Sequence, residues 1–405
     1  MTDEKAFPTA PAREPHDRLR SFAYRAALDV YTRLGTRWAP QRSPYMPGLP
    51  VRVEGFHEEI LGIGETARQF HRALMDAGHP VERLALDRRL RPVASPETPD
   101  EHPVLRLSHL NPDQLLEHSM RLASAADRRQ PHVGYWVWEL PRAPQRWRAA
   151  ARLVDRVWAP SRFAAGAIAA ALPASARVDV LPPPVLAQAA PASPPPVALD
   201  DDRVHILAAC DLRSSAARKN PTGALDAFDR ARNQAPARLV LKITAGEACP
   251  DALAALTARI GMRDDVRLIT EPLSDAGMQA LIAACDIALC LHRSEGFGLL
   301  AAHAASHGKP VIATNWSAPT EFLTPDGAAL VDYRLVPVAD PQGIYPPGQM
   351  WAEPELDHAA DWLTRLIDDA ELRARMGATA ARETRAQLGP DAWYGRFSAL
   401  LETLA

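Results

Sequence analysis

A carboxylate, a glycine turn and an imidazole follow one another in residues 294–314, SEGFGLLAAHAASHGKPVIAT. Glu295 opens the turn, and His303 stands eight positions later. The preceding apolar run predicts a strand and the alanine-rich run predicts a helix. A glycine turn between strand and helix presents free backbone N–H groups to a phosphate. Glu295 would be repelled by a phosphate, so we expect it to accept hydrogen bonds from hydroxyls. Together these features suit a nucleotide sugar.

Cations are grouped in a second stretch, DLRSSAARKNPTGALDAF, residues 211–228. It contains Arg213, Arg218 and Lys219, between a predicted strand and a helix that begins near Pro221. A departing nucleoside diphosphate gains negative charge as its bond to the sugar breaks. Cations placed beside it stabilise the transition state more than the ground state.

The stretch GYWVWELPRAPQRW, residues 134–147, places aromatic side chains before Glu139 at a predicted strand end. Aromatic faces pack on the C–H faces of sugars, and a carboxylate accepts sugar hydroxyls. We therefore expect Trp138 and Glu139 to contact a sugar or an acceptor. We expect one of Trp136 and Trp138, but not both, to belong to the core.

Two weaker signals lie earlier in the chain. Gly62 and Gly64 stand between a predicted strand and a helix, where a glycine loop would let the backbone approach a ligand. His109 ends the apolar run VLRLSHL, and a structural histidine is the favoured interpretation, with a ligand contact as the alternative.

The composition is that of an ordinary globular protein. The chain has 405 residues, 47% hydrophobic and 23% charged, with a formal net charge of −3, which disfavours a general nucleic-acid binder. The four cysteines lack metal-ligand spacing, and Asp200-Asp201-Asp202 is interpreted as a solvated charge run, so no metal or cofactor is expected. The polar N-terminus lacks a signal-peptide core, which favours the cytoplasm.

Strand-like and helix-like segments alternate in both halves, which predicts an α/β protein with two doubly wound, Rossmann-like domains facing each other across a cleft. The predicted divisions are an N-terminal extension (1–49), an acceptor domain (50–190), a nucleotide-sugar domain (191–387) and a C-terminal helix that crosses back (388–405). The extension carries an amphipathic helix at 17–38, packed on its own domain or resting on an anionic membrane. The proline-rich stretch 182–199 is the predicted linker.

The 294–314 stretch resembles the donor-site signature of the retaining GT-B glycosyltransferases of family 4, the group 1 glycosyltransferases. The resemblance implies that Glu295 binds the transferred sugar and that Lys219 and Arg213 hold the diphosphate. The family has a second Glu for the ribose where this chain has His303, and a histidine near the sugar where it has Trp138 and Glu139. Residues 345–360 resemble bacterial polysaccharide mannosyltransferases, with Trp351 as a structural anchor.

The resemblance implies a retaining transferase that moves a hexose, with mannose from GDP-mannose as one option, to a glycan or lipid-linked acceptor of a surface polysaccharide or lipopolysaccharide. A non-catalytic subunit that binds a nucleotide sugar, or a nucleotide-sugar epimerase, is the alternative. Peripheral contact with the inner face of the membrane stays open. The expected catalytic residues are Glu295, Lys219 and Arg213; the expected donor contacts are Arg218, Gly296, Phe297, Gly298, Leu299, His303, Thr314 and Asn315; and the expected acceptor or sugar contacts are Gly62, Gly64, His109, Trp138 and Glu139.

Overall fold

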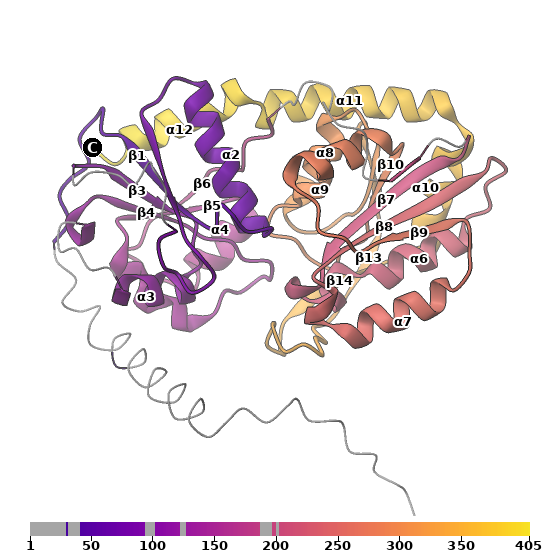
Figure 1. Ribbon diagram of the computed structural model, residues 1–405, viewed down its shortest axis with the longest axis horizontal. Helices are drawn as coiled ribbons and strands as arrows, with labels where there is room; N and C mark the ends of the chain where they lie inside the picture. The colour runs from indigo at the N-terminus through magenta and orange to yellow at the C-terminus, as the bar shows by residue number, and fades with distance from the viewer. Residues whose placement is uncertain (1–29, 31–40, 94–101, 122–126, 187–196, 200–201) are drawn as a thin grey trace, which may run out of the picture.

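The computed structural model describes residue 30 and residues 41–93, 102–121, 127–186, 197–199 and 202–405. Apart from residue 30, the predicted helix over 17–38 lies outside the described residues, as do residues 187–196 of the predicted linker. The described residues form two α/β domains that lie side by side (Figure 1).

The N-terminal domain is built on a six-stranded sheet in the order β2-β1-β3-β4-β5-β6, and every neighbouring pair is parallel. Its strands are β1 (Val51–Gly55), β2 (Val81–Ala85), β3 (Leu105–Ser108), β4 (His132–Tyr135), β5 (Arg156–Ala159) and β6 (Val178–Val180). Its helices are α2 (Gly62–Asp76), α3 (Pro112–Arg121), α4 (Arg162–Ala169) and the 3-10 segments η2 (Asp127–Arg129) and η3 (Gln145–Leu153). Every residue of β1 is buried, including the charged Arg52 and Glu54, which fits a strand of a parallel sheet that is covered on both faces.

The C-terminal domain holds a second parallel sheet in the order β12-β11-β10-β7-β8-β9. Its strands are β7 (Val204–Asp211), β8 (Ala237–Thr244), β9 (Val266–Ile269), β10 (Ile287–Cys290), β11 (Val311–Thr314) and β12 (Ala328–Val331). Its first helices are α5 (Ala216–Lys219), α6 (Pro221–Arg230), α7 (Pro250–Ile260), α8 (Asp275–Ala284) and α9 (Leu299–Ser306), with the 3-10 segments η4 (Leu212–Ser214), η5 (Gly246–Ala248) and η6 (Ala318–Glu321). The predicted two-domain GT-B architecture is confirmed.

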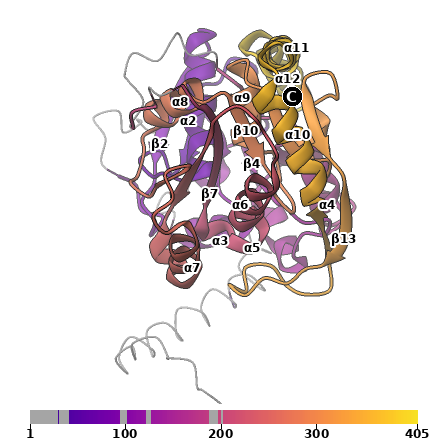
Figure 2. The ribbon, with the colours of Figure 1, turned by 90° about the vertical axis from the view of Figure 1, so that its right-hand side faces the viewer.

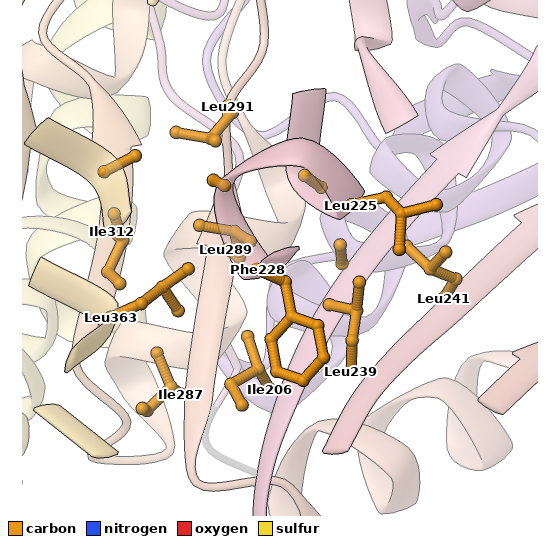
Figure 3. Packing of buried hydrophobic residues seen from close by; sticks show 14 of the residues in the cluster. Ile206, Leu225, Phe228, Leu239, Leu241, Ile287, Leu289, Leu291, Ile312 and Leu363 are labelled. Atoms are coloured by element: carbon orange, nitrogen blue, oxygen red, sulfur yellow. The ribbon is translucent and has the colours of Figure 1, made fainter. Parts of the chain in front are cut away.

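Apolar side chains fill both faces of the second sheet. On one face, Leu225 and Phe228 of α6 pack against Ile206, Leu239 and Ile287 of three adjacent strands (Figure 3). The opposite face is covered mainly by α8 and α9. These two apolar layers hold the carboxyl ends of the strands in fixed positions.

The sequence did not predict two of the observed features. One is the edge strand β12, and the other is the antiparallel hairpin of β13 (Tyr333–Pro337) and β14 (Met350–Pro354), which forms a separate two-stranded sheet. Residues 338–349 form the loop between these two strands.

Three helices end the chain: α10 (Leu356–Asp368), α11 (Ala370–Leu388) and α12 (Pro390–Glu402). Figure 1 shows α11 along the C-terminal domain and α12 over the N-terminal domain, and Figure 2 shows α11 nearly end-on above α10. Trp393 and Phe397 of α12 are buried with Phe70 of α2, and the rings of Phe70 and Trp393 lie 4.9 Å apart. The end of the chain therefore belongs to the core of the N-terminal domain.

Candidate functional site

The strand order of the second sheet reverses between β7 and β10. These strands are neighbours although 75 residues lie between the last residue of β7, Asp211, and the first residue of β10, Ile287. Crevices outside the carboxyl ends of strands at such a switch point are the usual ligand sites of doubly wound sheets. Here the segment after β7 carries Arg213, Arg218 and Lys219, and the segment after β10 carries Glu295. The fold thus brings together the two stretches in which the sequence predicted chemistry.

The cation segment has a locally determined backbone. Ser215 has φ 69°, and its side chain accepts a hydrogen bond from the backbone N–H of Arg218. Asn220 adopts the left-handed conformation that asparagine tolerates well, and its side chain caps α6 by accepting from the backbone N–H of Gly223. These two polar residues place Lys219 at the end of one helical turn, beside the cavity.

Glu295 is held by two cations. Lys219 Nζ donates to Glu295 Oε1 at 2.6 Å, and Arg218 Nη1 lies 3.2 Å from Glu295 Oε2. Burial disfavours the charged carboxylate, but the attraction of Lys219 and Arg218 outweighs it and lowers the pKa of Glu295 to about 2. Glu295 is therefore ionised throughout the neutral range.

Arg218 and Arg213 of this segment both hydrogen-bond to other protein groups. Arg218 is buried, with Nη1 donating to Ser294 O at 2.7 Å, so it fixes the backbone of the Glu295 turn. Arg213 forms a two-pronged pair with Asp211 and donates to Ile60 O in the N-terminal domain at 2.5 Å. Arg213 thus joins the cation segment to the opposite domain.

A cavity of about 550 Å³ lies over these residues, which is the usual size of a small-molecule site. The C-terminal domain contributes Asp211, Arg213, Arg218, Lys219, His292, Glu295, Gly296, Phe297, Gly298, Leu299 and Tyr345, and the N-terminal domain contributes Gly62, Thr66, Asn111, Gln114, Trp138 and Glu139, among others. The cavity therefore has walls from both domains.

Hydrogen bonds across the gap hold the two domains together. Arg68 of α2 makes a two-pronged pair with Asp275 of α8, at 2.6 and 2.8 Å. Glu321 accepts from the backbone N–H groups of Arg162 and Phe163, so it caps the N-terminus of α4 from the other domain. The arrangement is a closed one.

Gly296 and Gly298 of the Glu295 turn were expected to let the backbone approach a ligand, but their surroundings are protein atoms. A Cβ on Gly296 would lie 2.7 Å from Trp138 O, so this glycine permits close approach of the N-terminal domain, not of a ligand. Gly298 has φ +97°, which favours glycine, and a Cβ there would lie 2.9 Å from Pro319 Cγ. Phe297 packs on Phe322 at 5.2 Å in the core, although part of it lines the cavity.

His303 lies in a contact between the domains and not among the residues that line the cavity. Its Nε2 is 2.8 Å from Glu65 Oε1 of α2 and 3.0 Å from Gln69 Nε2. In the structure the partner of His303 is thus a carboxylate of the opposite domain, and the expected donor contact of His303 stays a prediction.

Three other expected contacts, Thr314, Asn315 and Gly64, lie outside the cavity lining, and His109 has the structural role that the sequence favoured. Buried Thr314 donates to His292 O at 2.7 Å, and neither Thr314 nor Asn315 lines the cavity. His109 is buried with its ring stacked on Tyr135 at 4.6 Å, so it belongs to the aromatic core. Gly64 is needed because a Cβ would collide with Phe56 O, and it lies outside the cavity lining.

The wall from the N-terminal domain is aromatic. Trp136 and Trp138 are both buried, and both contact Trp147, so the expectation that only one of them is in the core is wrong. The reason is that β4 ends at Tyr135 and the following residues leave strand geometry. Trp138 nevertheless lines the cavity beside Glu139.

Tyr345 and His292 are among the lining residues that the sequence analysis did not single out. Tyr345 donates to Glu139 Oε2 at 3.0 Å, and the Arg218 guanidinium lies 5.6 Å from the centre of its ring. Its position depends on the β13–β14 hairpin, for which the sequence offered no signal. His292 is buried, its ring nitrogens have no partner among the described residues, and burial lowers its pKa to about 4.

Within the described part of the chain, no three His, Cys, Asp or Glu side chains are grouped so that they could hold a metal ion. Among the same residues, no helix is both long enough and apolar enough to cross a membrane.

Comparison with known proteins agrees with this geometry. Residues 203–345 match the family model described as "Glycosyl transferases group 1". The chain is 31% identical over 127 residues to the MMP alpha-(1->4)-mannosyltransferase of Mycolicibacterium hassiacum, covering 31% of this chain and 26% of that protein. It is 31% identical over 227 residues to the D-inositol 3-phosphate glycosyltransferase of Kineococcus radiotolerans, covering 52% and 48%. The matched region thus spans about a quarter and about half of these relatives.

Solved structures share the architecture. HepE of Anabaena in complex with UDP and glucose has a TM-score of 0.60 at 15% identity, covering 88% of this chain and 100% of that one. Sucrose-phosphate synthase of Thermosynechococcus elongatus has a TM-score of 0.61 at 15% identity, covering 88% and 99%. At such identities the likeness concerns the fold. Residues 203–345 are thus similar to group 1 glycosyltransferases, within a chain that has the two-domain GT-B fold.

Proposed function

We propose that this chain is a glycosyltransferase that moves a hexose from a nucleoside diphosphate sugar to a glycan or glycolipid acceptor. The observation that carries the proposal is the contact of Lys219 with Glu295, which joins residues 76 positions apart at 2.6 Å in the cavity between the domains. A cation and a carboxylate side by side match the two halves of such a donor, its diphosphate and its sugar.

The charges of Lys219 and Glu295 suit different parts of the donor. Lys219 has three N–H donors and uses one on Glu295 among the described residues, so two can turn toward phosphate oxygens. These donors would stabilise the negative charge that develops on the leaving diphosphate. Glu295 would accept hydrogen bonds from hydroxyls of the transferred sugar.

Transfer with retention of configuration is part of the proposal. Glu295 already accepts from Lys219 and faces Arg218, and a carboxylate neutralised by two cations is a poor nucleophile. This favours a binding role for Glu295 over a covalent intermediate. The resemblance to group 1 enzymes points in the same direction.

The acceptor would enter along the wall from the N-terminal domain. Trp138 and Glu139 of the N-terminal domain both line the cavity and offer it an aromatic side chain and carboxylate oxygens. Contacts such as Arg68 with Asp275 keep the domains closed, which would exclude water and limit hydrolysis of the donor.

The donor remains a choice between hexoses. GDP-mannose is supported by the name of the mannosyltransferase relative, and UDP-glucose by the UDP and glucose in HepE. We also propose a role in surface polysaccharide synthesis at the inner face of the membrane. This rests on the resemblance of residues 345–360 to bacterial polysaccharide mannosyltransferases.

The test is turnover of GDP-mannose and UDP-glucose by the purified full chain, with octyl mannoside and octyl glucoside as acceptors and NMR of the product anomer. We expect Lys219→Met to lower kcat/KM by about 10²–10³-fold, as for loss of one transition-state donor. Lys309→Met, a lysine outside the cavity lining, is the matched control and should retain activity. Equal rates for the two variants would refute the role of Lys219, and an inverted product would refute retention.

A further inference from the structure

The loop between β13 and β14, residues 338–349, contacts both walls of the cavity. On one side, Gln342 accepts from the backbone N–H of Ala216 at 2.6 Å and donates to Leu212 O at 2.8 Å. On the other side, Gln349 accepts from the backbone N–H of Arg142 at 2.8 Å and donates to Arg142 O at 3.1 Å. The loop therefore ties the cation segment to the N-terminal domain.

Asp340 shapes this loop around Tyr345. Its Oδ2 accepts from the backbone N–H groups of Ile344 and Tyr345, at 2.8 and 3.0 Å, and its Oδ1 accepts from Ser215 Oγ at 2.8 Å. Tyr345 is 5% exposed, so its ring has a fixed place in the cavity wall. The turn delivers a tyrosine hydroxyl to the opposite domain.

That hydroxyl meets Glu139, whose Oε2 accepts from it at 3.0 Å. Glu139 O also accepts from Ser294 Oγ, next to Glu295. Burial is the main reason that the pKa of Tyr345 is raised well above 10.0, so the phenol stays protonated and donates. The Tyr345 hydroxyl thus orients the carboxylate of Glu139, and the Ser294 hydroxyl holds the backbone of Glu139.

We propose that Tyr345 is a positioning residue for acceptor binding: across the closed domains it holds Glu139 in the cavity, where Glu139 receives a hydrogen bond from the attacking hydroxyl of the acceptor. The inference rests on the proposed glycosyl transfer. The hydrogen bond between Tyr345 and Glu139 can form only when the two domains meet. Domain closure and acceptor binding would therefore depend on each other.

A competing possibility is that Tyr345 acts through Arg218, whose guanidinium lies 5.6 Å from the ring centre. Tyr345→Phe separates the two, because phenylalanine keeps the ring over Arg218 and removes only the hydroxyl that reaches Glu139. A role through Arg218 would affect the diphosphate side, and a role through Glu139 would affect the acceptor side.

The experiment compares wild type, Tyr345→Phe, Glu139→Gln and the double variant, using the donor that turns over and octyl glycoside acceptors. We expect Tyr345→Phe to lower the ratio of transfer to donor hydrolysis about tenfold, while affinity for UDP and GDP by calorimetry changes less than about twofold. In the Glu139→Gln background the same substitution should have little further effect. Glu139→Asp, whose shorter side chain cannot reach the phenol, should resemble Tyr345→Phe.

Three results would overturn the inference. They are an unchanged transfer ratio in Tyr345→Phe, an equal loss from Tyr345→Phe in both backgrounds, and a nucleotide affinity that falls as much as transfer does. Should Tyr345→Phe fold poorly, Glu139→Asp carries the same test. A wild-type chain that neither transfers nor hydrolyses any donor would instead refute the proposed function itself.

Discussion

Neutralising Glu295 tests the electrostatics of the site without requiring a substrate. In Glu295→Gln the side chain keeps its shape, but Lys219 and Arg218 lose their shared counter-ion. Glutamine resembles the protonated carboxyl, so the cost should equal the preference of the folded protein for the charged form. The pKa falls from 4.5 to about 2, which corresponds to roughly 3 kcal/mol at 1.36 kcal/mol per pH unit.

The sign of the pH dependence follows from the lowered pKa. Because the folded protein binds this proton less tightly than the unfolded chain, the stabilisation is complete well above pH 4.5 and is lost as the pH falls through 4.5 toward 2. The difference in unfolding free energy between wild type and Glu295→Gln should thus shrink from roughly 3 kcal/mol at pH 7 to roughly 1 kcal/mol at pH 3.

The assay is urea unfolding of both proteins between pH 7 and pH 3. Asp76→Asn is the matched control, since Asp76 pairs with Arg72 in an exposed i,i+4 arrangement worth about 0.3–0.5 kcal/mol. If Glu295→Gln is as stable as wild type at pH 7, or if the difference does not change with pH, the two cations do not stabilise the carboxylate as the geometry indicates.

Two further substitutions test the contacts between the domains. Gly296→Ala puts a methyl group against Trp138 O and should destabilise the chain by about 1–3 kcal/mol and enlarge it in small-angle scattering, whereas Gly166→Ala, with open space around it, should not; equal behaviour would contradict the close approach. His303→Glu places a second carboxylate beside Glu65 and should lower the melting temperature, while the exchanged pair Glu65→His with His303→Glu should recover most of the loss; no recovery would mean that their contact contributes nothing.

The residue pattern within single segments was enough to predict most of the helices and strands. The alternation in VRVEG of β1 and the strong helix formers leucine and alanine in α9 are local signals, so these element types could be predicted from the residues in them. The edge strand β12 and the β13–β14 hairpin were missed, because a short edge strand and a hairpin apart from the sheets show no comparable pattern.

Some residues of the candidate site could be predicted from the sequence, but their contacts could not. Lys219 and Glu295 could be identified because each follows a strand and precedes a helix, and the carboxyl ends of parallel strands meet at one edge of a sheet. Their contact at 2.6 Å could not be predicted from the sequence, since it depends on how the chain between these two residues, which are 76 positions apart, packs.

The sequence alone determined which side chains lie at the ends of β7 and β10, because that depends on hydrophobic patterns within single segments. Only the tertiary structure decided that Gly296 faces Trp138, that His303 pairs with Glu65 and that Tyr345 reaches Glu139. Each of these contacts joins the two domains, and nothing within either segment specifies the partner that closure brings against it.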